Sequence, residues 1–509
     1  MALGSTRTAA VTGIAASIVD VEASVGRGLP GIHVLGLGDT AVSEARDRIR
    51  TACLNSSLPW PRTRIVVSLS PASLPKSGSG FDLAMALAVL TAGDQSEGVG
   101  VLDSTLILGE IGLDGAVRPV TGVLPALLAA RDAGLGRAVV PRANAAEAAL
   151  VPSFPVFIVD TLDQAFRWAV GRGELASVSE VACGVKLEEA VPDFSDVLGQ
   201  PEARLAAEIA AAGGHHMLMT GPPGSGKSMI AARLPGILPS LSERQRLEVT
   251  AVHSVAGRTF TGPVLRAPFV APHHSITRAA LLGGGAGSPL PGAVSLAHHG
   301  VLFLDEVSEI PAGTLDSLRT PLDTGMVRVL RSRRDVTFPA RFQLVLAANP
   351  CRCAAESARR CRCRSGERAR HLSNLSGPLR DRIDLHVTTR ARGAVVTPGS
   401  EESSVVMAER VAVARERASY RWRHAGGEAV LTADISGAVL RRDHAAEDAA
   451  MAFLASHTAR GRISQRRVDR TLRLAWTLAD LEQRNRPDLD HIARALEYSV
   501  SGGMEPADD

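Results

Sequence analysis

A glycine-rich loop in the middle of the chain has the residue types needed to bind phosphate. It fits the pattern G-x-x-x-x-G-K-[ST] and consists of Gly221, Pro222, Pro223, Gly224, Ser225, Gly226, Lys227 and Ser228. A β-like stretch (HHMLMT) precedes the loop and a helical stretch (SMIAARLPGIL) follows it. The glycines let backbone N–H groups and the helix N-terminus point at phosphates. We expect Lys227 to contact the β- and γ-phosphates of ATP and Ser228 to bind Mg²⁺.

Two carboxylates follow a short apolar run further along the chain. Residues 301–304 (VLFL) lead directly into Asp305 and Glu306, a pattern typical of a buried parallel strand with ligand-binding residues at its carboxyl end. We predict that Asp305 holds the Mg²⁺ shell and that Glu306 is the general base for the attacking water. Another apolar run, FQLVLAAN, ends at Asn349, which is suited to orienting the same water.

Two arginines in later segments are candidates for contacts with the transition state. In residues 376–384 (SGPLRDRID), Arg382 is the favoured arginine finger, which would stabilise charge on the γ-phosphate in a neighbouring subunit's site. The alternatives are Arg380, or a plain Asp381–Arg382 ion pair on the surface. Arg466 opens a C-terminal helical pattern (ISQR) and is predicted to reach the nucleotide of its own subunit. The alternative for Arg466 is a solvated, arginine-rich helix face.

A group of cysteines follows Asn349 directly. Its members are Cys351, Cys353, Cys361 and Cys363. Four thiolates this close in sequence can close a tetrahedral Zn²⁺ site of structural type. Free or redox-labile thiols and an iron–sulfur cluster are the alternatives. Arginines surround the group (Arg352, Arg359, Arg360, Arg362 and Arg364), so zinc would hold a basic knuckle suited to contact DNA.

The elements that must position these residues follow from apolar periodicity. Alternating β-like and helical patterns predict an α/β fold class for the first part of the chain, with β-like runs IASIVDVEASV, IHVLGL, RIVVSLS, LILGEIGL, RAVVP and VFIVD. The stretch PEARLAAEIAAAG predicts a helix at 201–213. The predicted organisation is an α/β domain at 1–172, a linker at 173–195, an ATPase core at 196–390, a linker at 391–404, a helical lid at 405–500 and a disordered tail at 501–509.

Composition is that of a soluble, cytoplasmic protein of about three domains. The 509 residues are 45% hydrophobic, and no apolar run approaches the ~20 residues that span a bilayer. We therefore expect no membrane association. The net charge of +3 hides a basic segment, residues 328–384, which contains 14 arginines and five acidic residues. Such a segment favours a polyanionic partner, the alternative being a solvated or subunit-facing surface.

Several motifs resemble one known family in order along nearly the whole chain. They are GPPGSGKS, PFVAPHHSIT, SLAHHGVLFLDE, AANPCRC, SGPLRDRID and ISQRRVDRTLRLAWTLADL, with GLPGIHVLGLGDTAVSEARDRIRTA and LSPASLPKSGSGFDLAMAL before them. These look like the magnesium-chelatase-like AAA+ ATPases of the YifB/ComM group. The group usually has leucine where this chain has Arg380, which leaves the identity of the finger less sharply defined.

The resemblance implies a homo-hexameric ring that hydrolyses ATP and drives DNA branch migration. Single-stranded or branched DNA would then be the partner. The resemblance also implies an insertion around residues 268–292 and a β-hairpin within residues 326–344, which would aim Arg331, Arg333 and Arg334 at the pore of the ring. Two alternatives remain: an ATPase subunit of the magnesium-chelatase type that remodels a protein partner, and an adaptor that binds ATP without turnover.

The N-terminal part is similar to the proteolytic domain of Lon, which implies a Lon-protease-like (S5-like) α/β fold. Lon-type hydrolysis needs a serine nucleophile and a lysine in one pocket. The resemblance places Gly80 and Leu124 at these two positions. Ser79 lies one residue away, but no lysine occurs in residues 77–185. We therefore expect a scaffold or DNA-guiding role and no peptidase activity. For His273 and His274, we favour structural hydrogen bonding over metal binding.

Overall fold

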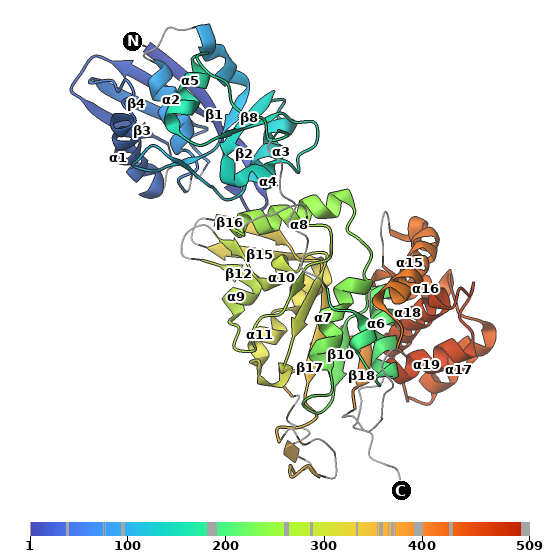
Figure 1. Ribbon diagram of the computed structural model, residues 1–509. Coiled ribbons are helices and arrows are strands. Elements are labelled where there is room, and N and C mark those ends of the chain that lie inside the picture. Colours follow the sequence, from blue (N-terminus) through green and yellow to red (C-terminus); the bar gives the residue numbers. More distant parts are fainter. Residues whose placement is uncertain are drawn as a thin grey trace.

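A computed structural model describes most of the chain, in the arrangement drawn in Figure 1. The described residues are 2–36, 40–74, 76, 78–92, 97–180, 191–258, 264–285, 289–331, 334–353, 355, 360–364, 366–367, 371, 373–390, 401–426 and 431–499. Arg333, Arg359, the side chains of Arg331 and Arg334, most of the 391–404 linker and the 501–509 tail lie outside them. Within them, no helix has the length and apolar character needed to cross a membrane.

The N-terminal part is a mixed seven-stranded sheet in the order β3-β4-β2-β1-β5-β8-β9. Its strands are β1 (Ala2–Thr12), β2 (Ala15–Gly26), β3 (Gly31–Leu35), β4 (Arg64–Ser70), β5 (Thr105–Ile107), β8 (Arg137–Pro141) and β9 (Val156–Val159). Its helices are α1 (Thr40–Asn55), α2 (Asp82–Ala92), α3 (Val123–Asp132), α4 (Ala145–Ala148) and α5 (Leu162–Ala169). Every residue of α2 is buried, and the helix packs on β1 and β2.

The central part contains a second sheet, of five parallel strands in the order β11-β14-β17-β10-β18. The strands are β10 (Met217–Thr220), β11 (Phe269–Val270), β14 (Val301–Leu304), β17 (Gln343–Ala348) and β18 (Leu385–Thr388). All residues of β14 and β17 are buried, as expected for apolar strands covered on both faces. Because these strands are parallel, the residues that follow β10, β14 and β17 meet at one edge.

Three helices accompany this sheet, and each has a sequence-encoded boundary. They are α6 (Pro201–Gly213), α7 (Lys227–Ile237) and α8 (Glu243–Val255). Helix α6 begins with proline in its first turn and ends before Gly214, whose φ of 77° is the left-handed cap that glycine favours. Helix α8 begins with a reciprocal capping box between Ser242 and Gln245.

The insertion and the hairpin expected from the sequence are both present on one side of this sheet (Figure 1). The insertion contains α9 (Arg278–Leu282), β12 (Gly283–Gly284) and β13 (Leu290–Pro291), and α10 (Ala293–Leu296) follows it. The hairpin pairs β15 (Met326–Arg331) with β16 (Arg334–Pro339), after α11 (Ala312–Asp316) and α12 (Arg319–Thr324). Leu330, next to the hairpin tip, is 65% exposed.

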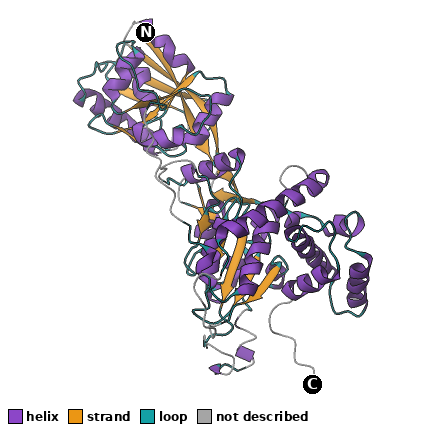
Figure 2. Ribbon diagram, turned by 45° about the vertical axis from the view of Figure 1, so that its right-hand side comes forward, coloured by secondary structure: helices purple, strands orange, loops and turns teal. Residues whose placement is uncertain are grey.

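The C-terminal part is helical, as Figure 2 shows by the purple ribbons beside the central sheet. Its α-helices are α15 (Ser404–Gly426), α16 (Gly437–Arg442), α17 (Asp448–Ala459), α18 (Gln465–Leu481) and α19 (Leu489–Ser499). One apolar core joins these helices to α6, α7 and the central sheet. Trp422 and Trp476 lie edge to face in this core, with their ring centroids 5.8 Å apart.

The N-terminal sheet domain contacts the central part at two places. Helix α3 packs on α8, and Ala251 of α8 belongs to the same apolar cluster as Leu124 of α3. The β1–β2 turn approaches the hairpin so closely that a Cβ at Gly13 would meet Thr337 O and a methyl group of Val336, each at 3.0 Å. The N-terminal sheet domain therefore rests on α8 and on β16.

Candidate active site

The phosphate loop connects the carboxyl end of β10 to the first turn of α7. Gly224 and Gly226 have φ values of +73° and +87°, so the backbone turns in a conformation that other residues rarely adopt. A Cβ added at either glycine would meet nothing within 4 Å, so the outer face of the loop is open to a phosphate. This open loop at the start of a helix fits a nucleotide phosphate chain.

Lys227 is 7% exposed and folds back over the loop. Its Nζ donates hydrogen bonds to Gly221 O at 2.8 Å and to Pro222 O at 2.9 Å. The same Nζ lies 3.3 Å from Asn349 Oδ1, which follows β17. Burial lowers the pKa of Lys227, while the negative charges of Asp305 and Glu306 oppose that shift. The lysine and the expected water-orienting asparagine are thus in direct contact.

The two expected magnesium ligands are also in contact. Ser228 Oγ donates to Asp305 Oδ2 at 2.8 Å. Asp305 Oδ1 accepts a hydrogen bond from the backbone N–H of Glu306, also at 2.8 Å. Hydroxyl and carboxylate oxygens beside a phosphate loop suit Mg²⁺, which prefers few protein ligands together with substrate phosphates. When bound, Mg²⁺ would neutralise charge on the phosphates.

Glu306 occupies a strained backbone position. Its φ of +47° lies in the left-handed region, which costs a residue with a side chain about 1–3 kcal/mol. Its carboxylate pairs with His274, with 3.0 Å between Glu306 Oε2 and His274 Nδ1. By contrast, His273 bonds locally, to Ser275 Oγ at 2.8 Å. The hydrogen bonding that we expected within the insertion therefore holds for His273, whereas His274 contacts the candidate base.

The sequence contained a signal for the contact between His274 and Glu306. His274 follows β11, and β11 pairs in parallel with β14, the strand that precedes Asp305 and Glu306. Residues beyond the carboxyl ends of these two strands must lie at the same edge of the sheet. The pairing of β11 with β14 was not predicted, so the contact was missed.

Arg382 and Arg466 belong to a second group of charged residues. Arg382 Nε donates to Asp323 Oδ1 at 2.7 Å, and its NH2 donates to the other carboxylate oxygen. Arg466 NH1 donates to Asp381 Oδ2 at 2.7 Å. The carboxylate bound by Arg382 is therefore that of Asp323, and Asp381 is bound by Arg466 instead. Arg382 thus contacts α12, and Arg466 contacts the residue that precedes Arg382.

A buried hydrogen-bond network lies beneath this second group. His215 Nδ1 is 3.0 Å from Asp384 Oδ2, and His215 Nε2 is 2.8 Å from Thr477 Oγ1 on α18. Arg470, also on α18, approaches the other Asp384 oxygen at 3.9 Å. Burial alone would raise the pKa of Asp384, but the His215 hydrogen bond and the charges of Arg473 and Arg470 hold it below its ordinary value. The network joins the central sheet to the C-terminal helices.

Comparison with known proteins places the chain in a family. Three family descriptions match consecutive parts of the chain: "Subunit ChlI of Mg-chelatase" (residues 21–144), "Magnesium chelatase, subunit ChlI" (193–395) and "Magnesium chelatase, subunit ChlI C-terminal" (401–499). YifB of Escherichia coli is 37% identical over 505 residues, which cover 98% of this chain and 97% of YifB. Competence protein ComM of Haemophilus influenzae is 36% identical over 509 residues, with the same coverage. The chain belongs to the magnesium-chelatase-like YifB/ComM family.

Two further relatives differ in how much of the chain they match. An uncharacterised protein of Mycobacterium tuberculosis is 49% identical over 505 residues, which cover 99% of both chains. A Lon protease of Mycolicibacterium smegmatis is 29% identical over 160 residues, 30% of this chain and 20% of the protease. The YifB/ComM family thus extends over nearly the whole chain, whereas the similarity to Lon is partial.

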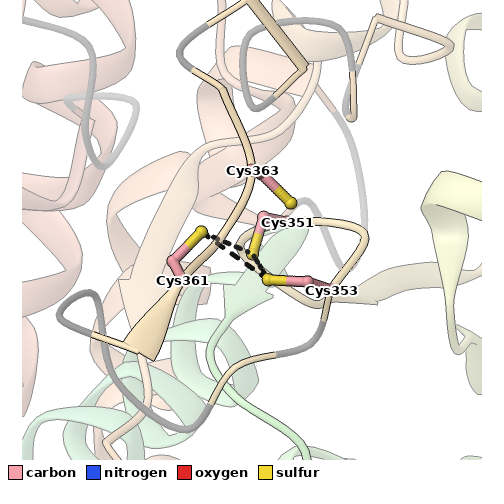
Figure 3. A group of neighbouring side chains, drawn as sticks. All are labelled: Cys351, Cys353, Cys361 and Cys363. Carbon is pink, nitrogen blue, oxygen red and sulfur yellow. Dashed lines mark hydrogen bonds between the residues drawn. The ribbon is translucent and has the colours of Figure 1, made fainter.

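The four cysteines of this family member converge in space, as Figure 3 shows. The Sγ atom of Cys351 lies 3.3 Å from that of Cys353 and 3.4 Å from that of Cys361. Cys353 and Cys361 are 3.6 Å apart, and Cys363 completes the group with all four sulfurs within 4.8 Å. Tetrahedral Zn²⁺ with Zn–S bonds of ~2.3 Å requires sulfurs about 3.8 Å apart. The cysteines therefore fit Zn²⁺ after small adjustments.

A second group, Glu248, His298 and His299, also brings metal-type ligands together. The backbone N–H of Arg341 donates to His298 Nδ1 at 3.1 Å, so Nε2 carries the proton of the neutral ring. That Nε2 faces Glu248 Oε2 at 3.3 Å and donates to it. Burial lowers the pKa of His298 to about 4, so the ring is neutral at pH 7. This group is a hydrogen-bonded contact between α8 and the start of β14 and offers no His298 lone pair to a metal.

The Lon-like positions of the N-terminal domain contain no serine–lysine pair among the described residues. Leu124, at the lysine position, is fully buried in the cluster that reaches α8. Ser79, beside Gly80, donates a hydrogen bond to Glu110. Lys76 is fully buried, its Nζ donates to Pro71 O, and burial lowers its pKa. These residues, near the positions that align with the Lon dyad, are engaged in contacts within the domain.

Proposed function

We propose that this chain is the subunit of a homo-hexameric, ATP-hydrolysing motor that acts on DNA, as a branch-migration helicase or translocase. The observation that carries the ATPase proposal is the contact group at the carboxyl ends of β10, β14 and β17. In this group Lys227 touches Asn349, and Ser228 touches Asp305. Lys227 and the loop would hold the phosphates, Glu306 would take a proton from the attacking water, and Asn349 would orient that water.

The ring is proposed because the expected finger, Arg382, belongs to a different set of contacts from the residues around the phosphate loop. Arg382 is bound to Asp323 at the far end of α12, whereas the groups that surround the phosphate loop come from three strand ends. A finger supplied by a neighbouring subunit would complete each site and stabilise charge on the γ-phosphate. Arg466, which contacts Asp381 in this structure, is proposed to reach the nucleotide of its own subunit.

DNA is the proposed substrate for two reasons. Residues 328–384 carry a large excess of arginine, which favours a polyanion. A relative that covers nearly the whole chain is named a competence protein. We further propose a Lon-like N-terminal domain (1–172) that acts as a scaffold or DNA guide, a helical lid (405–500), structural zinc on the four cysteines, and a cytoplasmic location.

The test is an ATPase assay with single-stranded, duplex and branched DNA, beside an unwinding assay on the branched substrate. We expect ATP turnover that DNA stimulates and that salt weakens steeply, because bound arginines release counterions. Lys227→Ala is the control and should abolish both activities. Turnover without stimulation by any DNA would refute the DNA proposal and leave the ATPase.

The second candidate is an ATPase subunit of the magnesium-chelatase type, which the matched family descriptions favour. Such a subunit would remodel a protein partner. The cysteine group is an addition to a motor and lid and argues for another role, whereas the N-terminal domain itself matches a chelatase subunit description over residues 21–144 and does not separate the two candidates. Stimulation of the ATPase by a chelatase partner protein, in place of DNA, would decide for this candidate.

A further inference from the structure

The contact between Arg382 and Asp323 joins two elements that are far apart in the sequence. Arg382 follows the short helix α14 (Gly377–Arg380), whereas Asp323 lies in α12. The Asp323 carboxylate accepts hydrogen bonds from Nε and NH2 of the Arg382 guanidinium, with 2.7 Å between Nε and Oδ1. On the other side, NH1 donates to Pro378 O at 2.6 Å. Three N–H groups of Arg382 are thus engaged within the subunit.

Enough donors remain on Arg382 for a phosphate. A guanidinium has five N–H groups, so two are left, one on NH1 and one on NH2. Two donors are what a bidentate contact with a phosphate requires. The Arg382 side chain is 26% exposed, so these donors can be reached from outside the subunit. The Asp323 contact is therefore compatible with a finger that reaches a neighbour.

The segment that leads into Arg382 is already fixed by hydrogen bonds. Ser376 caps α14 and bonds to Asp316 of α11. Asn374 Nδ2 donates to Val307 O at 2.6 Å and to Ile310 O at 2.8 Å, just after Glu306. The long side chain of Arg382 is the part that would still need ordering. A carboxylate that holds it in one rotamer reduces the side-chain entropy that must be lost when the transition state forms.

We propose that Asp323 is the positioning residue for the arginine finger: its carboxylate fixes the Arg382 guanidinium in the orientation that completes the ATP site of the neighbouring subunit. The proposal rests on the proposed function, because it needs a ring and a finger. Asp323 is three residues before Met326, where the hairpin begins, and Ala340 N donates to Gly325 O at 2.8 Å to close its base. The orientation of the Arg382 side chain is thus fixed by a residue close to the base of the hairpin.

The first experiment compares steady-state ATPase constants of the full chain for Asp323→Asn, Asp323→Glu and Arg382→Ala. Loss of an arginine finger lowers kcat by about 10³-fold or more. We expect Asp323→Asn to lower kcat at least tenfold with KM for ATP unchanged, and Asp323→Glu, which keeps the carboxylate, to recover part of the loss. Asp160→Asn is the matched control, because Arg142 and Asp160 form the same two-bonded pair at 2.7 Å elsewhere in the chain.

A double variant separates a positioning role from a structural one. If Asp323 acts through Arg382, Asp323→Asn adds little to the loss caused by Arg382→Ala, whereas independent effects would multiply. The ATPase activity of rings mixed from two variants provides the second readout. Asp323→Asn subunits keep an intact phosphate loop, and Lys227→Ala subunits keep an aimed finger, so mixed rings should hydrolyse ATP faster than either variant alone.

The outcomes distinguish this inference from the function on which it rests. A wild-type chain without ATP turnover, or an Arg382→Ala variant with normal turnover, would refute the proposed motor site and the inference with it. With those two results as expected, a normal or raised kcat in Asp323→Asn would overturn the inference alone, since a latch that restrains the finger predicts a raised rate. Failure of mixed rings to recover activity would overturn it as well.

Discussion

Removal of the Asp384 carboxylate tests how the central sheet is joined to the C-terminal helices. Asp384→Ala would take away the partner of buried His215 (3.0 Å) and the nearest countercharge of Arg470 (3.9 Å). Breaking a buried pair by removing one partner costs about 3–5 kcal/mol, because the other polar group stays buried. The loss should fall on α18, which carries Arg470 and Thr477.

Hydrogen exchange of the α18 backbone amides, read by mass spectrometry, measures this loss locally. A cost of 3–5 kcal/mol corresponds to exchange faster by about 10²-fold to 4 × 10³-fold, since each 1.4 kcal/mol is tenfold. Asp443→Ala is the control: it removes an exposed pair with Arg442, for which about 0–1 kcal/mol is expected. Equal exchange rates in the two variants would refute the reasoning.

The same comparison has a predicted pH dependence. The folded-state pKa of Asp384 lies below the ordinary aspartate value. A depressed pKa contributes stability above the unfolded value of about 4, and this contribution is lost as the pH falls through the folded-state pKa. The ratio of α18 exchange rates in Asp384→Ala and in the wild type should therefore be largest at pH 7 and fall toward one below about pH 4.

Three further predictions concern the ATP site and the cysteine group. Glu306→Gln should bind ATP with unchanged affinity but lower kcat by about 10²–10⁴-fold, the usual worth of a general base, as measured by nucleotide binding beside turnover; normal turnover would remove Glu306 from the mechanism. Lys227→Ala should lose nucleotide affinity in the same binding assay, and unchanged affinity would contradict its assigned role. Elemental analysis should find one zinc per purified chain and none in Cys351→Ser; a zinc-free wild type, or a variant that keeps the metal, would count against the structural zinc site.

Local signals in the sequence were sufficient for the phosphate loop and for several elements around it. Helix α6 spans Pro201–Gly213, the bounds expected from its apolar pattern and its flanking proline and glycine. Strand β1 was missed, because its alanine and glycine residues have little strand character of their own. It forms because all eleven of its residues pair with β2.

The contacts that were not predicted join residues that are distant in the chain. The only partner that the sequence suggested for Arg382, as the alternative to a finger, was its neighbour Asp381, but the structure pairs Arg382 with Asp323, 59 residues earlier. The contact of His274 with Glu306 likewise depends on which strands lie side by side. Spacing along one element predicts which face a side chain occupies, whereas such contacts depend on how separate elements pack.

The contact of Gly13 with β16 has a practical consequence for testing the proposed motor. Because the β1–β2 turn touches the hairpin, a displacement of the hairpin must also move the N-terminal sheet or open that contact. Leu29, in the loop between β2 and β3, is 89% exposed and lies outside the proposed ATP site. A fluorescent label at this position would report hairpin movement during ATP turnover without touching the residues that perform it.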